Sequence, residues 1–297
     1  MSLVNAAQTP SEEALVFDCD GAQLLGVLHH GSPDADFAVV TIVAGGPQYR
    51  GGVGRQLVTL GRRLAAEGIP VFRFDHRGMG DSAGAFRGFE DMQGDLEAAL
   101  AALLTRRPGI RRVLLWGGCD AASAALINAH CLPQVVAIAV ANPWITDDRM
   151  ADRVQRQHFL RRLGEGSFWK KVFTLQYNPL DYARGAMAKL RRKAESSPSQ
   201  TSASAAPPQS FVVRMRQGLE SFDGELFLLM SGRSLISRQF DQLLASDARW
   251  QRAVEDKLVE RHIVEGADQT FSGVAARDEM LATLIRWAQQ VRDKGAA

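Results

Sequence analysis

The stretch Val113-Leu-Leu-Trp-Gly-Gly-Cys-Asp-Ala-Ala-Ser-Ala124 decides the fold of this chain. An apolar run ends in two glycines, and an alanine-rich segment of helical character follows Cys119. This order is typical of a nucleophile elbow, a strand-to-helix turn that holds a reactive side chain in the open. Because the turn is sharp, the residues two before and two after the reactive position must be small. Gly117 and Ala121 meet that requirement when the motif is centred on Cys119.

Two interpretations of Cys119 follow from this stretch. A cysteine at a helix N-terminus feels the positive end of the helix dipole, which favours the reactive thiolate. The alternative is a buried cysteine at an ordinary strand–helix junction, since free cysteine is among the most buried residue types.

Composition narrows the class of protein. The chain has 297 residues, of which 46% are hydrophobic and 23% charged, and this favours one large globular domain with a smaller insertion. The net charge of +2 indicates neither a nucleic-acid partner nor an anionic membrane surface, and no apolar run approaches the ~20 residues of a membrane span. Three scattered cysteines and an N-terminus without signal-peptide character predict a cytoplasmic location. We expect no cofactor and no metal.

The order of apolar runs predicts the architecture. Residues 14–18 and 23–29 flank Asp20-Gly21 as a β-hairpin. Further strands are expected at 37–43, 69–74, 113–116, 135–141, 225–230 and 259–264, with helical segments between them. This alternation predicts an α/β fold: a mostly parallel sheet with helices on both faces and an inserted helical cap.

The same rhythm predicts the domain organisation. Residues 1–143 and 225–297 form the core, residues 144–195 a helical cap, and residues 211–224 the return to the core. Residues 196–210 contain only Ser, Ala, Pro, Gln and Thr, a composition typical of a disordered loop.

Chemistry at an elbow needs an oxyanion hole, a base and an acid in addition to the nucleophile. The backbone N–H of Asp120 and that of Gly46, in the loop after the third strand, are the expected oxyanion donors. The loop after the last strand, Val264-Glu-Gly-Ala-Asp-Gln-Thr-Phe-Ser272, has no histidine, and Ser231-Gly-Arg-Ser-Leu235 has no carboxylate.

At this point the chain resembles a known family, and the resemblance rests on five motifs. They are Gly45-Gly-Pro-Gln-Tyr-Arg50, Phe72-Arg-Phe-Asp-His-Arg-Gly-Met-Gly-Asp-Ser82, Trp116-Gly-Gly-Cys-Asp-Ala-Ala-Ser123, Asn142-Pro-Trp144 and Gly266-Ala-Asp-Gln-Thr-Phe-Ser272. Together they look like the first of two α/β-hydrolase-fold proteins encoded beside exosortase A in Gram-negative bacteria that make exopolysaccharide. The resemblance implies a cytoplasmic hydrolase-like protein with a cysteine at the elbow. It also implies that Gln269 stands at the histidine position and Ser234 at the aspartate position.

Four residues are candidates to replace the missing base. Asp268 adjoins the expected position, His262 lies within the last strand, His76 follows the strand at 69–74, and His158 lies in the cap. Each has an argument against it: an Asp268 carboxylate would repel a thiolate, His262 is about seven residues from position 269, the position of His76 is usually structural, and a histidine in a mobile cap is usually solvated.

Two functions remain open. The first is an acyl-group hydrolase or transferase acting on an ester or thioester through Cys119, with a weakened triad. The second is a degenerate member that binds a small-molecule ligand or a partner without turnover, since both Ser234 and Gln269 depart from triad chemistry.

Overall fold

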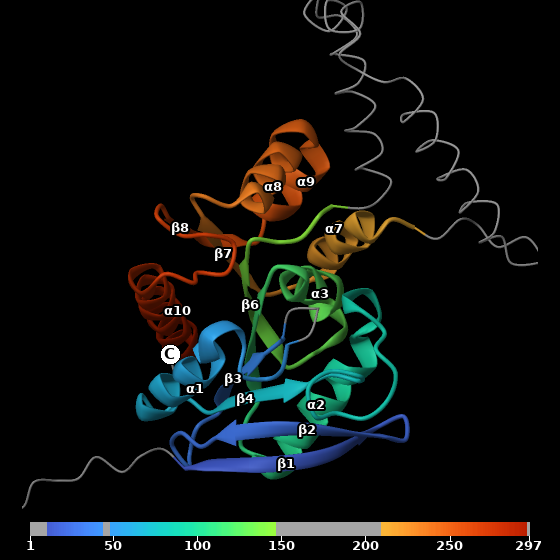
Figure 1. The fold of residues 1–297 in the computed structure, drawn as a ribbon, viewed down its shortest axis with the longest axis vertical. Coiled ribbons are helices and arrows are strands. Elements are labelled where there is room, and N and C mark those ends of the chain that lie inside the picture. Colours follow the sequence, from blue (N-terminus) through green and yellow to red (C-terminus); the bar gives the residue numbers. More distant parts are fainter. Residues whose placement is uncertain (1–10, 44–47, 147–208, 296–297) are drawn as a thin grey trace, which may run out of the picture. The chain divides into compact units, whose positions relative to one another are not determined.

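A computed structural model describes residues 11–43, 48–146 and 209–295. The chain divides into a compact unit of residues 1–145 and 211–297 and a second unit of residues 146–210. The first unit is built on an eight-stranded sheet in the order β1-β2-β4-β3-β5-β6-β7-β8 (Figure 1). The hairpin strands β1 and β2 form one edge, β2 pairs antiparallel with β4, and every pairing from β4 to β8 is parallel.

The strands agree with the predicted order and differ at their ends by a few residues. Their bounds are β1 Glu12–Cys19, β2 Ala22–His29, β3 Phe37–Thr41, β4 Val71–Asp75, β5 Arg112–Gly118, β6 Val135–Ala141, β7 Glu225–Ser231 and β8 Leu258–Val264.

Helices cover both faces of the sheet, as the alternating sequence predicts. On one face lie α1 (Gln56–Ala66) and α10 (Val274–Lys294). The other face carries α2 (Gln93–Arg106), α3 (Asp120–Asn128), α7 (Phe211–Ser221), α8 (Leu235–Ser246) and α9 (Ala248–Glu255). Short 3₁₀ turns complete the described connections: η1 Val53–Arg55, η2 Phe89–Asp91 and η3 Ala129–Cys131.

Alternation along each central strand produces the two cores. On β5, Val113 and Leu115 pack into the core under α2 and α3, whereas Leu114 and Trp116 pack into the core under α1 and α10. A strand buried on both faces must be apolar throughout, which explains the continuous hydrophobic runs in the sequence. The α/β fold with a mostly parallel sheet that those runs predict is confirmed.

The order of the strands in the sheet determines where a ligand site is expected. The connection after β3 leads through α1 to β4, while the connection after β5 leads through α3 to β6 on the other side of β3. Ligands of open α/β sheets bind outside the carboxyl ends of the strands at such a switch point. In this chain the switch point lies between β3 and β5, and β5 ends in the predicted elbow.

Within the described residues, no helix combines the length and apolar character needed to cross a bilayer. The predicted cap and the predicted disordered segment lie, except for residues 144–146 and 209–210, outside the residues that the structure describes.

Candidate active site at the strand–helix elbow

Cys119 occupies a strained backbone position between β5 and α3. Its φ of 61° and ψ of −123° are unfavourable for a residue with a side chain. Such strain persists only where the surrounding structure over-determines it, and it clusters at functional sites. Gly117 permits the turn, because a Cβ at this position would lie 2.5 Å from the carbonyl oxygen of Ala121. The small residues predicted around Cys119 are therefore required by close backbone contact.

Backbone hydrogen bonds hold the elbow from both sides. The Cys119 N–H donates to the carbonyl of Ala141 at 2.8 Å, and the Cys119 carbonyl accepts from the N–H of Trp144 at 3.2 Å. Ser123 is fully buried, and its hydroxyl donates to the Trp144 carbonyl at 2.6 Å. The turn is thus fixed to the end of β6 and to the segment that follows it.

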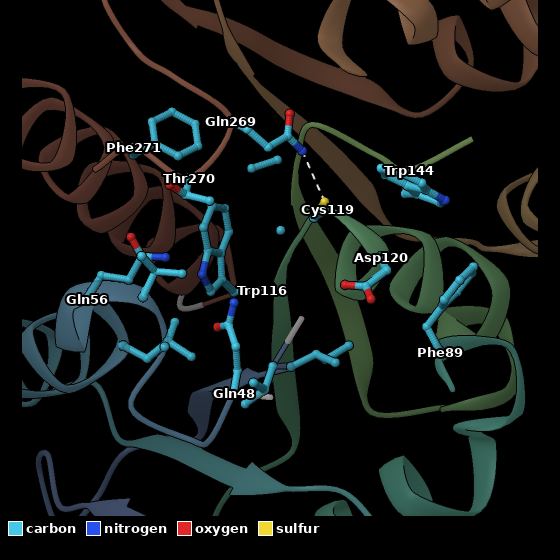
Figure 2. Close-up of a pocket in the computed structure, with 17 residues that line it drawn as sticks. Gln48, Gln56, Phe89, Trp116, Cys119, Asp120, Trp144, Gln269, Thr270 and Phe271 are labelled. Atoms are coloured by element: carbon cyan, nitrogen blue, oxygen red, sulfur yellow. Dashed lines mark hydrogen bonds between the residues drawn. The ribbon is translucent and has the colours of Figure 1, made fainter. Parts of the chain in front are cut away.

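The sulfur faces a cavity of about 380 Å³. Cys119 is half-buried, so the interpretation of a sealed core cysteine is wrong. The walls are largely apolar and come from the carboxyl ends of β3 and β5, the start of α1 and the loop before α10; they include Ile42, Val43, Leu57, Trp116, Trp144 and Phe271 (Figure 2). A largely apolar cavity with few polar groups suits an acyl chain.

Gln269 contacts the sulfur and Ser234 contacts Gln269, although neither residue type belongs to an ordinary triad. The Gln269 side chain points at Cys119, with its amide nitrogen 3.0 Å from the sulfur (Figure 2). Its amide oxygen accepts a hydrogen bond from the Ser234 hydroxyl. The order Ser234–Gln269–Cys119 therefore has the connectivity of an acid–base–nucleophile triad with different chemical groups.

The Ser234 hydroxyl fixes the direction of this chain. Ser234 is the N-cap of α8, and its oxygen accepts from the N–H groups of Ile236 at 3.1 Å and Ser237 at 3.3 Å. With both acceptor positions occupied, the hydroxyl proton is left to donate to Gln269. The Gln269 NH₂ group then faces the sulfur as a donor, so it can stabilise a thiolate but cannot accept a proton.

Burial reverses the expected effect of the helix dipole on Cys119. Loss of solvation raises the pKa of the thiol, and the Asp120 carboxylate raises it further. Hydrogen bonds from Gln269 and from the backbone N–H of Asp120 act in the opposite direction and lower the pKa. Because burial is the larger effect, the expectation that the elbow favours the thiolate is wrong for the free protein. The two described groups that lower this pKa, the Gln269 amide and the Asp120 backbone N–H, are both hydrogen-bond donors to the sulfur.

Asn142 supports the site and had no role assigned from the sequence. It is buried, adopts a left-handed φ of 47°, and bonds to three parts of the chain. Its amide nitrogen donates to the Ser231 hydroxyl at 2.7 Å and to the Gln269 carbonyl at 3.0 Å. Its amide oxygen accepts from the Ser231 N–H at 2.8 Å and from the Ser237 hydroxyl at 2.6 Å. Asn142 thereby ties the end of β6 to β7, α8 and the Gln269 loop.

None of the candidate replacement bases in the described residues reaches the sulfur. His262 bonds to Glu279 at 2.8 Å on the surface. Asp268 turns back on its own loop, where the amide and hydroxyl of Ser272 lower the pKa of its carboxyl. His76 is buried beside Phe86, and desolvation lowers its pKa. His158 lies outside the described residues.

The oxyanion donors are placed in part. The Asp120 N–H lies at the start of α3, beside the cavity. Gly46 lies outside the described residues, but the chain is anchored immediately after it. The Arg50 backbone N–H donates to the buried carboxylate of Asp75, and the Arg50 guanidinium bonds to the same carboxylate at 2.5 Å. The end of β4 thus holds the segment that follows Gly46.

The sheet order, the strained elbow and the cavity above it define an α/β-hydrolase. A family model described as "Serine aminopeptidase, S33" (Hydrolase_4) matches residues 36–200, more than half of the chain, and the protein belongs to this family. No curated protein matches the sequence.

Solved structures share the fold at low sequence identity. An esterase from Pyrococcus furiosus is 15% identical, with a TM-score of 0.59 over 95% of this chain and 91% of that chain. Alpha/beta hydrolase domain-containing protein 10 from mouse is 13% identical, with a TM-score of 0.55 over 94% of this chain and 99% of that one. The α/β-hydrolase GrgF from Penicillium is 15% identical, with a TM-score of 0.57 over 94% of this chain and 98% of that one. These likenesses show the fold.

Proposed function

We propose that the protein takes an acyl group from a thioester onto the sulfur of Cys119 and releases it slowly to water or faster to a better acceptor. One observation carries this proposal: the sulfur stands at a strained elbow, in a largely apolar cavity, with two N–H donors directed at it. In the first step the Cys119 thiol loses its proton to solvent, and a lone pair of the resulting thiolate forms the S–C bond. The bond from the carbonyl carbon to the leaving group breaks, and the leaving group departs with the electron pair.

Because the described site has no general acid to protonate a leaving group, thioesters are favoured over oxyesters as acyl donors. A departing alkoxide needs a proton from a general acid, and neither Gln269 nor Ser234 has an acidic proton near neutral pH. A departing thiolate is stable enough to leave without one, because thiols have a pKa near ~8.5. The site therefore supports attack on a thioester while giving little help with an oxyester.

Release of the acyl group is the slow step of this proposal. Water must lose a proton as it attacks the acyl-cysteine, and the described part of the site offers Gln269 as a donor only. Removing the base from a serine triad costs on the order of 10⁴–10⁶ in rate. An acceptor thiolate needs no base, so transfer to a thiol is faster than hydrolysis here.

A binding protein is the second candidate, and the Ser234–Gln269 hydrogen bond favours it. The two amide ends of Gln269 are both satisfied in the free protein, as expected for a site that holds a ligand and carries out no proton transfer. In that case the cavity binds an acyl ligand without covalent reaction.

Acyl labelling separates the two candidates. The full chain is incubated with N-acetylcysteamine thioesters of several acyl lengths and weighed by intact mass spectrometry. We expect one added acyl mass, which Cys119→Ser removes. Cys131→Ser is the matched control, since Cys131 is also half-buried with a pKa raised by burial, and it should retain the adduct. Absence of both adduct and turnover at every length would leave the binding function.

We also propose that the protein serves the exosortase A system in the cytoplasm. The motif resemblance supports this assignment, and the genes beside the coding sequence test it. Loss of exopolysaccharide or of exosortase substrates in a deletion strain is the expected phenotype.

A further inference from the structure

A second hollow, lined by arginines, lies beside the cysteine cavity. Its volume is about 360 Å³, and its walls come from the turn before α1, from α1 itself and from the start of α10. The basic residues in these walls are Arg55, Arg62, Arg63 and Arg277, against one carboxylate, Asp278. We define these lining residues as the basic hollow.

Two of the four guanidiniums are already neutralised. Arg62 bonds to Glu12 at 2.6 Å, and Arg63 lies 3.6 Å from Asp278. Among the described residues, Arg55 and Arg277 have no carboxylate within ion-pair distance, although both line the hollow. The Arg277 guanidinium reaches the turn that precedes Arg55, because a Cβ on Gly54 would be 3.6 Å from it. The hollow thus presents two uncompensated positive charges.

The two hollows are lined by neighbouring stretches of the chain. Gln56 and Leu57 at the start of α1 line the cysteine cavity, and the neighbouring Arg55 and Val58 line the basic hollow. On the other side, Thr270 and Phe271 line the cysteine cavity, and the chain then enters α10, whose first turn carries Arg277. The start of α1 therefore contributes to both hollows.

We infer that the basic hollow binds the phosphate of a phosphopantetheine-type carrier whose thioester reaches Cys119. This inference rests on the proposed function and names its substrate class. Arginine is the residue best suited to phosphate, which its planar fork binds with two parallel hydrogen bonds. The carrier's extended arm joins a thioester at one end to a phosphate at the other, which matches an apolar cavity adjoining a basic hollow. The leaving group is then the carrier thiolate.

The test compares two donors that differ only in the phosphate. Acyl-4′-phosphopantetheine and acyl-pantetheine with the same acyl group are used to label the full chain. We expect the phosphorylated donor to acylate Cys119 at least tenfold faster at low salt, and the preference to shrink with added salt because the attraction is screened. Arg55→Gln with Arg277→Gln should abolish the preference while leaving the pantetheine rate unchanged. The matched control is Arg249→Gln with Arg252→Gln, two exposed arginines on α9.

A binding measurement keeps the inference independent of acylation. Desulfo-coenzyme A is titrated into Cys119→Ser protein by calorimetry, with and without the Arg55 and Arg277 substitutions. We expect at least tenfold weaker binding without the two arginines. Equal binding overturns the inference, while labelling by acyl-pantetheine still decides the proposed function. Arginine-dependent retention on vesicles of anionic phospholipid, without any preference for the phosphorylated donor, also overturns it.

Discussion

The elbow and the loops after β7 and β8 differ in what they retain of a hydrolase site. At the elbow, Cys119 keeps the strained backbone, the glycine contact and the opening to the cavity. In the two loops, Ser234 and Gln269 keep the positions of an acid and a base but replace proton acceptors with a hydrogen-bond donor. The geometry of a catalytic site and its proton chemistry are therefore separable, because backbone packing sets the first and side-chain identity the second.

The largest expected effect comes from Asn142, which joins the two regions. Asn142→Ala removes the acceptor of the Ser237 hydroxyl proton and the donor to the Gln269 carbonyl, and it places alanine at a φ of 47°. We expect the free energy of unfolding to fall by about 2–4 kcal/mol in chemical denaturation. Asn128→Ala is the control, since this buried asparagine makes one hydrogen bond within α3 and should cost less. Equal losses would show that Asn142 does not link the regions.

The next effect tests the elbow alone. Gly117→Ala drives a Cβ against the Ala121 carbonyl, and we expect a loss of roughly 1–3 kcal/mol in stability together with loss of acyl labelling. Gly118→Ala provides the neighbouring control, because its Cβ would meet no atom closer than 4.0 Å. Thermal unfolding that is the same for both variants contradicts the role assigned to Gly117.

Placing a histidine at position 269 and an aspartate at position 234 tests whether the site lacks only a general base and the acid that orients it. In Gln269→His with Ser234→Asp, an imidazole replaces an amide that lies 3.0 Å from the sulfur. We expect thioester hydrolysis to rise tenfold or more, about 1.4 kcal/mol in the barrier. The single variant Ser234→Asp supplies no base and should show no gain. An unchanged rate in the double variant would mean that the site has diverged beyond these two positions.

A smaller effect concerns the pH dependence of Cys119. Burial raises the pKa of its thiol, so alkylation by iodoacetamide should accelerate with rising pH and approach its plateau above the range of an ordinary cysteine. Gln269→Met removes the donor at the sulfur and raises this pKa further. We expect alkylation at neutral pH to slow by about two- to tenfold, with the same rate at high pH. A downward shift of the profile would show that Gln269 does not stabilise the thiolate.

The smallest effect is expected at His262, which the sequence offered as a base. Its ring bonds to Glu279 on the surface, so His262→Asn should change stability by less than about 0.5 kcal/mol and leave acyl labelling intact. Loss of labelling in this variant would assign the histidine a function that its position in β8 does not suggest.

Local patterns were sufficient to predict the fold and the elbow. Apolar runs identify the strands, and small residues at two fixed offsets identify Cys119, because both signals lie within a few residues of each other. The sequence also indicated that Ser234 and Gln269 occupy triad positions, through the resemblance. The structure brings the three side chains together.

Signals that depend on distant residues were not available from the sequence. Asn142 contacts partners 89 and 127 positions away, so no local spacing reveals its four hydrogen bonds. The direction of the Cys119 pKa shift was predicted wrongly, since the helix dipole is visible in sequence whereas burial depends on the tertiary packing around the sulfur. The basic hollow likewise combines α1 and α10, which are more than 200 positions apart.

The one-way hydrogen bonding from Ser234 through Gln269 to Cys119 has a kinetic consequence. Neither a hydroxyl nor an amide changes charge between pH 5 and 8, so this pair contributes no ionisation to the rate in that range. A histidine triad gives a profile with an inflection near neutrality. In this protein the rate of acyl transfer should instead rise with pH through one ionisation. The midpoint of that rise is the pKa of the Cys119 thiol.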